Sequence, residues 1–290
     1  MKLSALCCVV LLIHNDVQAQ EYSIFRAKKI QVTPELAFRP GELLIYGSKI
    51  IRVGENIEKP EKFKLISWEN HYIYPGLISP GSSLGLTEIN AIRPTRDESE
   101  VGTHTPEIEA WTGVNPDSEL IPVARANGIT HSLIIPMGGT ISGISGLISL
   151  NGWGIEEMAI KQKVALHIWW PGHGLSSNDN LKEGKSIDEQ VKDRNKSVSE
   201  IDDFFNQAEA YAQSKNNFPK SKINFNPSWE AMIPFISRKK PLIIHADEKR
   251  QILSALNWAQ KRKYKIIISG GRDAWKIAER ISSKKVPVIF

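Results

Sequence analysis

Residues 74–86 read YPGLISPGSSLGL, and this stretch predicts the architecture of the rest of the chain. Its apolar start predicts a buried strand over Tyr72–Ile78, and small residues follow that strand. In α/β folds a strand that runs into a loop of small residues is a common place for a site, because a ligand can approach the backbone there. We therefore expect the neighbouring segments to be organised around this strand end, which includes Ser83.

The segment before this strand has the pattern of a small antiparallel β unit. Short apolar runs alternate with turns from Tyr22 to Tyr74. The turn residues Gly47-Ser48 separate two such runs within residues 42–54, which is typical of two strands joined by a tight turn. Helix is not expected in this part of the chain.

The segment after residue 119 alternates between predicted helices and strands. Its strands are rich in β-branched residues, which predicts a parallel sheet covered by helices, either open or closed into a barrel. The pattern is clearest in the last third of the chain. There it predicts the strand Leu242–Ala246, the helix Glu248–Arg262, the strand Lys265–Ser269, the turn Gly270-Gly271, the helix Asp273–Ile281 and a strand from Val286.

Composition is that of an ordinary soluble globular protein, with 41% hydrophobic and 24% charged residues. A chain of 290 residues can form one large domain or two smaller ones. The net charge is +5, basic residues cluster at 238–240 and 261–263, and neither cluster contains aromatic residues. This pattern argues against a nucleic-acid partner.

The first 19 residues have the pattern of an export signal. Lys2 is followed by the apolar run Leu3–Ile13, and the small residues Val17 and Ala19 precede a plausible cleavage position. The apolar run is too short to span a bilayer, so no membrane span is expected. The chain's 2 cysteines both lie in this segment, so the mature chain would have no disulfide. We expect an exported protein, periplasmic or extracellular.

His245 is the strongest single candidate for a functional residue. It ends an apolar strand, and an imidazole there can bind a metal ion or transfer a proton. The alternative is a histidine that is hydrogen-bonded at the strand end for structural reasons. Gly270-Gly271, and the Gly/Ser-rich residues 138–146, can bind an anion through backbone N–H groups, with tight turns as the alternative. The chain has no HxH or HxxxH spacing, so it contains no local metal motif.

Several stretches resemble the imidazolonepropionase-like group of the amidohydrolase superfamily. Residues 45–54, 74–78 and 84–86 are similar to the opening of these proteins, and residues 115–130, 241–246 and 270–271 resemble later parts. The resemblance implies a small N-terminal β-sandwich portion at 20–74, leading into a metal-dependent (β/α)₈ barrel of the TIM type at 75–290. In this family one or two divalent metal ions generate hydroxide, which attacks a C–N bond.

The chain departs from the family pattern at specific positions. The first barrel strand of the family ends in His-x-His, and here Gly81 and Ser83 stand at those positions. His245 matches one later metal-ligand histidine, whereas the position of the next falls near Ser269-Gly270. The late aspartate of the family would lie beyond Phe290, and residues 75–290 are fewer than the ~250 of a typical barrel. We therefore expect an incomplete barrel that lacks its last unit, in a C-terminally truncated chain.

The resemblance implies a hydrolase that acts on C–N bonds, in an amide or cyclic amide, of a small substrate. We expect a Zn-type divalent metal at His245 and substrate contacts at Ser83, Gly270 and Gly271, with the catalytic residue unassigned. The alternative is a metal-free, non-catalytic exported relative that binds a ligand or a partner. A homo-oligomer is also among the expected assemblies.

Overall fold

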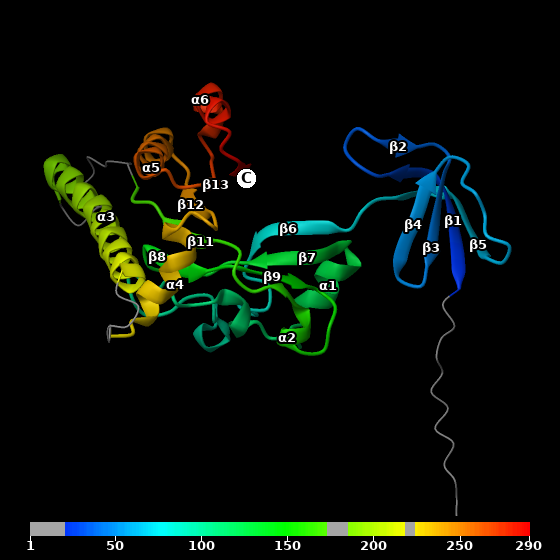
Figure 1. The fold of residues 1–290 in the computed structure, drawn as a ribbon, viewed down its shortest axis with the longest axis horizontal. Coiled ribbons are helices and arrows are strands. Elements are labelled where there is room, and N and C mark those ends of the chain that lie inside the picture. Colours follow the sequence, from blue (N-terminus) through cyan, green and yellow to red (C-terminus); the bar gives the residue numbers. More distant parts are fainter. Residues whose placement is uncertain (1–20, 173–184, 218–223) are drawn as a thin grey trace, which may run out of the picture. The chain divides into compact units, whose positions relative to one another are not determined.

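The computed structural model describes residues 21–172, 185–217 and 224–290, and Figure 1 draws its fold. The predicted export signal at 1–19 lies outside these residues and stays a prediction. In the described ranges, none of the helices is both long and apolar enough to span a bilayer. Contacts divide the chain into two units, Met1–Pro75 and Gly76–Phe290, which are described separately.

The first unit contains one five-stranded sheet, built around β1 (Tyr22–Gln31). β1 pairs antiparallel with β2 (Ala37–Phe38) and β3 (Gly41–Tyr46), and parallel with β5 (Lys64–Ile73). β4 (Lys49–Gly54) pairs with β3 across the predicted turn, where Gly47 has a φ of 58°. Because alternate residues point to opposite faces, Ile24 and Ala27 join two separate apolar clusters. A second sheet is not found within residues 21–75, so the sandwich stays a prediction.

The predicted buried strand over Tyr72–Ile78 is wrong in both its extent and its burial. Tyr72 and Ile73 end β5, and the chain leaves the sheet at Tyr74–Gly76 before β6 (Leu77–Ser82) begins. Pro75 has no N–H to donate to a strand partner, which explains the break. The Leu77 and Ile78 side chains are each 61% exposed, because β6 pairs with a single neighbour in the described part of the chain.

The second unit contains two sheets with helices around them. The four-stranded sheet has the order β10-β9-β7-β6, and the five-stranded sheet has the order β14-β13-β12-β11-β8. The strands after β6 are β7 (Ile129–Ile134), β8 (Ile141–Ile144), β9 (Gly146–Ser149), β10 (Ala159–Lys161), β11 (Leu166–Trp169), β12 (Leu242–Ala246), β13 (Ile266–Gly270) and β14 (Val288–Ile289). The helices are α1 (Leu120–Ala126), α2 (Ile155–Met158), α3 (Ile187–Asn217), α4 (Pro227–Ile236), α5 (Lys249–Arg262) and α6 (Ala278–Ser283), with 3₁₀ turns η1 (Arg93–Thr95), η2 (Ala110–Gly113) and η4 (Ala274–Ile277).

Strands β11 to β14 run parallel to one another, as the alternation of predicted strands and helices required. The predicted helix over 273–281 is divided between η4 and α6. Among the described residues no ladder of hydrogen bonds joins β6 to β14, so the two sheets remain separate. The fold is therefore mixed α/β with several sheets, and a closed barrel is not shown.

The main core lies between the five-stranded sheet and its helices. Leu166, Ile168, Ile244 and Ile268 point toward α3, α4 and α5, and they belong to the largest apolar cluster. The alternate residues point to the other side, which we call the inner face. Ala165 and Ile243 pack there against Leu133 of β7. Because side chains alternate along a strand, His167, Trp169, His245 and Ser269 also belong to the inner face.

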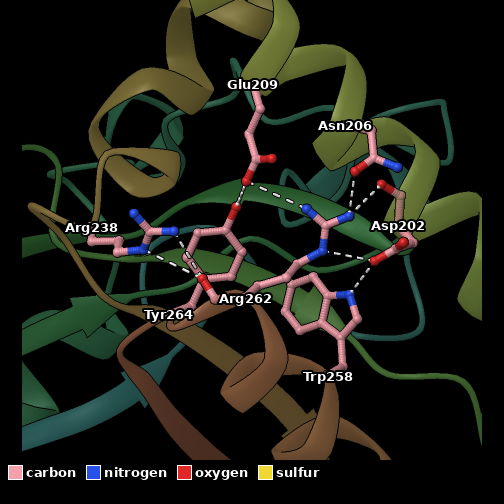
Figure 2. A network of polar contacts seen from close by, with 7 residues as sticks. All are labelled: Asp202, Asn206, Glu209, Arg238, Trp258, Arg262 and Tyr264. Carbon is pink, nitrogen blue, oxygen red and sulfur yellow. Dashed lines mark hydrogen bonds and ion pairs between the residues drawn. The ribbon is translucent and has the colours of Figure 1, made fainter.

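A polar network fastens α3 to α5 on the outer side of the sheet, and Figure 2 shows it. Arg262 donates from Nε to Asp202 at 2.7 Å and from Nη2 to Asn206 at 2.6 Å. Glu209 accepts from both Arg262 and the Tyr264 hydroxyl. Burial and this carboxylate raise the pKa of the Tyr264 hydroxyl, so Tyr264 acts as a hydrogen-bond donor at neutral pH. The network holds in place the long helix that covers the sheet.

Candidate functional site

Two imidazoles meet on the inner face of the five-stranded sheet, one from β11 and one near the carboxyl end of β12. The Nδ1 atom of His167 lies 2.9 Å from the Nε2 atom of His245, which is a hydrogen-bond distance. The Trp169 indole stacks on the His245 ring, with centroids 3.8 Å apart and planes 8° apart. Register explains the contact, because Trp169 is directly opposite His245 in the parallel pair. His167 is fully buried, whereas His245 is partly exposed and within reach of a ligand.

A chain of hydrogen bonds fixes the indole that covers His245. Trp169 Nε1 donates to the Ser142 hydroxyl at 3.1 Å, and that hydroxyl donates to the Pro136 carbonyl at 3.2 Å. Ser142 lies in β8, which pairs with β11, and its side chain is buried. A hydroxyl has one hydrogen to donate and accepts others, so this arrangement satisfies it in both roles. Trp169 is therefore held in one orientation over His245.

Both imidazoles are uncharged at neutral pH. Burial lowers the pKa of His245 to about 4, although the nearby Asp247 carboxylate opposes this shift. Burial also lowers the pKa of His167 well below its ordinary value, and the facing His245 adds to the effect. With both rings neutral, one nitrogen of the 2.9 Å pair carries the hydrogen and the other accepts it. His167 Nε2 is buried and has no partner among the described residues.

Lowering the pH should therefore reduce the free energy of unfolding, over a pH range that depends in part on His245. The unfolded chain takes up this proton near pH 6.5, and the folded chain only near pH 4. Between these values the unfolded state binds more protons, so the free energy of unfolding falls as the pH is lowered through the window. Urea unfolding across this range, for wild type and His245→Asn, measures the effect, which we expect to be smaller in the variant. An NMR titration midpoint for His245 near 6.5 would contradict this prediction.

The predicted substrate residues Gly270 and Gly271 have structural partners in the folded chain. Gly271 N–H donates to the Ala246 carbonyl at 2.9 Å, and Arg272 N–H donates to the Asp247 carboxylate at 3.3 Å. A side chain at Gly270 would meet that carboxylate, because a Cβ there would lie 2.6 Å from Asp247 Oδ1. These contacts explain the two glycines as a close turn. Their role in substrate binding stays a prediction.

Ser83 lies in the turn after β6. Among the described residues its backbone hydrogen bonds stay within this turn and do not reach His167 or His245. Its carbonyl accepts from Leu86 N–H at 2.9 Å and from Thr87 N–H at 3.2 Å. The neighbouring Ser82 hydroxyl accepts from Leu84 N–H at 2.9 Å. A role for the Ser83 side chain in substrate binding is not tested by these contacts.

The Gly/Ser-rich residues 138–146 take part in two strands, and their role in anion binding stays a prediction. They contain β8 and the start of β9, and several of their backbone N–H groups donate to carbonyls. Thr140 and Ile141 both donate to the Thr103 carbonyl, and Ile144 donates to the Ile108 carbonyl. Gly143 allows this approach, because its φ is 128° and a Cβ there would lie 2.6 Å from Ile108 O. The small residues let segment 103–108 pass close to β8.

The sequence interpretation missed that His167 and Trp169 share a face with His245. The signal was present as strand alternation. Ala165, His167 and Trp169 follow one another at intervals of two, as do Ile243 and His245 in the next strand. Alternate residues of a strand point to the same face of the sheet. Because β11 and β12 are neighbours, the rings of His167, Trp169 and His245 therefore lie together on one face. Ser142 carried no such signal, because β8 was interpreted as part of a loop.

The described residues do not fit the metal centre that the resemblance implies. A catalytic zinc ion needs about three protein ligands with one position left open. Within residues 21–172, 185–217 and 224–290, no group of three or more His, Cys, Asp or Glu side chains is placed to hold a metal ion. Gly81 and Ser83 bring no imidazole from β6, and the two histidine nitrogens face each other.

Comparison with solved structures shows a known fold. Fifteen solved chains match, among them an amidohydrolase from Thermotoga maritima MSB8 with a TM-score of 0.78 and 24% sequence identity. The alignment covers 92% of this chain and 69% of that chain. No protein-family model matches the sequence, and no curated protein matches it. This chain therefore shares the fold of an amidohydrolase.

Proposed function

We propose that this chain is a relative of the amidohydrolases that binds a small amide-type ligand at the carboxyl ends of β11–β13 without a catalytic metal ion. The hydrogen bond of 2.9 Å between His167 and His245 is the observation that carries the proposal. It uses the two nitrogens that face each other, and no third ligand joins them among the described residues. The likeness to a hydrolase fold supports the amide class of ligand.

The inner face offers the chemistry that an amide needs. His245 is partly exposed and neutral, so the ring nitrogen that does not face His167 can form one hydrogen bond with an amide group. The Trp169 edge and the partly exposed Ile267 supply the adjoining apolar surface. Ligand sites commonly combine a mostly apolar lining with a few polar groups in this way.

Metal-dependent hydrolysis of a C–N bond, in an amide or cyclic amide, is the second candidate. One observation favours it: His167 Nε2 is buried and unpartnered in the described part of the chain, and a metal ion would satisfy such an atom. In this case His167 and His245 would supply two of the ligands of a Zn-type ion. The chemistry that such an ion supplies is the polarisation of a water molecule.

Several further features belong to the same proposal. We include an incomplete (β/α) barrel that lacks its last unit, a small N-terminal β-sandwich, export to the periplasm or the exterior, and a homo-oligomeric assembly. The TM-score of 0.78 supports the overall architecture. The apolar run and small residues at 3–19 support export.

Zinc retention separates the two candidates. The purified chain is equilibrated with excess zinc, dialysed and analysed for bound metal, beside the variants His245→Ala and His167→Ala. We expect much less than one zinc ion per chain and no difference among the three proteins. A full zinc equivalent that both variants lose would overturn the metal-free proposal and support hydrolysis.

Ligand binding is tested with a cyclic amide as the probe. Hydantoin is titrated into the ¹⁵N-labelled chain, and the indole N–H signal of Trp169 is followed with and without EDTA. We expect the same shift in both conditions, and a weaker response in His245→Ala. Ser142→Ala tests the orientation of the Trp169 indole. It removes the hydrogen bond that holds the indole and leaves His245 intact. A shift that disappears with EDTA would contradict metal-free binding.

A further inference from the structure

A recess of about 390 Å³ lies in the second unit, away from the histidine pair. Its lining comes from residues 116–125, which include most of α1, and from residues 150–158, which follow β9. β9 runs antiparallel to β7, so Leu150 lies beside the start of β7, where its N–H donates to the Thr130 carbonyl. The recess therefore lies at the amino end of β7, and its volume is within the range of small-ligand sites.

The charge around this recess is predominantly negative. Asp117, Glu119 and Glu157 line it, and none of these carboxylates forms an ion pair with a described residue. The lining contains one positive group, Arg125, whose Nη1 donates to the Leu150 carbonyl and to Asn151 Oδ1, both at 3.2 Å. An anion would therefore meet more repulsion than attraction here, whereas a cation would be favoured.

An aromatic wall completes the recess. The Trp153 side chain is 93% exposed, although indole is among the side chains with most to gain from burial. Its backbone is held in place, because its N–H donates to Glu157 Oε2 at 3.0 Å and Gly152 has a φ of 150°. The turn thus holds the Trp153 backbone against the Glu157 carboxylate and leaves the ring exposed. Buried Ile121 and Met158 contribute the apolar side of the lining.

We propose that this recess binds the guanidinium group of an arginine-type ligand. The flat cation attracts both the face of an indole and the oxygens of carboxylates, and the recess supplies both next to each other. Asp117, Glu119 and Glu157 provide acceptors, and Trp153 provides the stacking surface. Free arginine and an arginine side chain in a peptide share this chemistry.

Fluorine NMR of the full chain labelled with 5-fluorotryptophan tests the proposal. The Trp153 signal is assigned from Trp153→Phe, and N-acetyl-arginine amide is titrated to millimolar concentration. We expect a saturable shift of this signal, and none with N-acetyl-citrulline amide, which has the same shape without the charge. Free arginine and a capped Ala-Arg-Ala peptide are compared next, and the tighter of the two identifies the source of the group.

Matched variants connect the shift to the recess. Binding measured by calorimetry should weaken roughly twofold to fivefold in Trp153→Ala and in Glu157→Gln. Glu156→Gln removes the same charge from the neighbouring position, which is outside the lining, and should leave affinity unchanged. Trp275 is the control ring, because it is 72% exposed and already has the Lys276 ammonium 5.5 Å from its centroid. Equal shifts for Trp153 and Trp275, or an equal response to citrulline, would overturn the proposal.

Discussion

Replacing Phe205 with alanine should lower the free energy of unfolding by about 3–5 kcal/mol. The Phe205 side chain is fully buried in the largest core cluster, between α3 and the five-stranded sheet. Its ring meets the Trp258 ring edge-on at 5.0 Å and lies 5.4 Å from the Tyr264 ring. Truncation would remove these contacts and leave a cavity that the surrounding rings cannot fill. Urea unfolding followed by circular dichroism measures the loss.

Phe204 provides a control within the same helix. Its side chain is only partly buried, and its ring lies 4.7 Å from that of His104. Phe204→Ala should therefore cost less than half as much as Phe205→Ala. Equal losses for the two variants would contradict the difference in burial between the Phe205 and Phe204 side chains.

Replacing Arg262 with alanine should destabilise the chain by about 2 kcal/mol. The Arg262 side chain is 11% exposed and bonds to Asp202, Asn206 and Glu209. Its removal would leave two carboxylates without a cation, at positions only partly open to water. Because Asp202 and Glu209 are each about a third exposed, the expected loss is below that of a fully buried pair.

The pH dependence of the Arg262 variant gives a second measurement. The hydrogen bond from Arg262 is the main reason that the pKa of Asp202 lies below its ordinary value. A lowered carboxyl pKa contributes stability above the unfolded value, and that contribution disappears as the pH falls toward the folded value. Arg262→Ala should therefore lose less stability than wild type on acidification below pH ~4. Lys261 is exposed and makes the smallest of the contributions to the lowered pKa of Asp202, so Lys261→Ala should change both measurements much less than Arg262→Ala.

The strong βα units of the last third could be predicted from sequence because local pattern and tertiary environment agree there. Leu242–Ala246 is predicted and observed with the same bounds, since both faces of this strand are covered. α3 shows the limit of periodicity. Ile201, Phe205 and Ala208 recur at intervals of three and four and are buried, whereas the apolar Ile187 at the start of the same helix is 48% exposed.

Other parts of the fold depended on pairings that a single sequence does not contain. The Gly/Ser-rich residues 138–146 resemble a loop locally, yet β8 forms there because it pairs with β11 and accommodates segment 103–108. Tyr72–Ile78 resembles one strand locally, yet Pro75 divides it between two units of the chain. In both cases long-range contact overrode local propensity.

The candidate site was predicted only in part for the same reason. His245 was identified from its place at a strand end. Its partner His167, and the covering Trp169, depend on which strand lies next to β12. Asp117 and Glu119 lie about forty residues before Glu157, so no local motif could have indicated that these carboxylates line one recess.

The hydrogen-bonded chain from Pro136 through Ser142 to Trp169 has a consequence for selectivity. Side chains that are already ordered lose little conformational entropy on binding, and each one left free would cost about 0.5–1.5 kcal/mol to immobilise. The inner face is in this sense preorganised, since His245 is held from one side by Trp169 and from another by His167. Such a rigid surface favours ligands of one shape and adapts poorly to others.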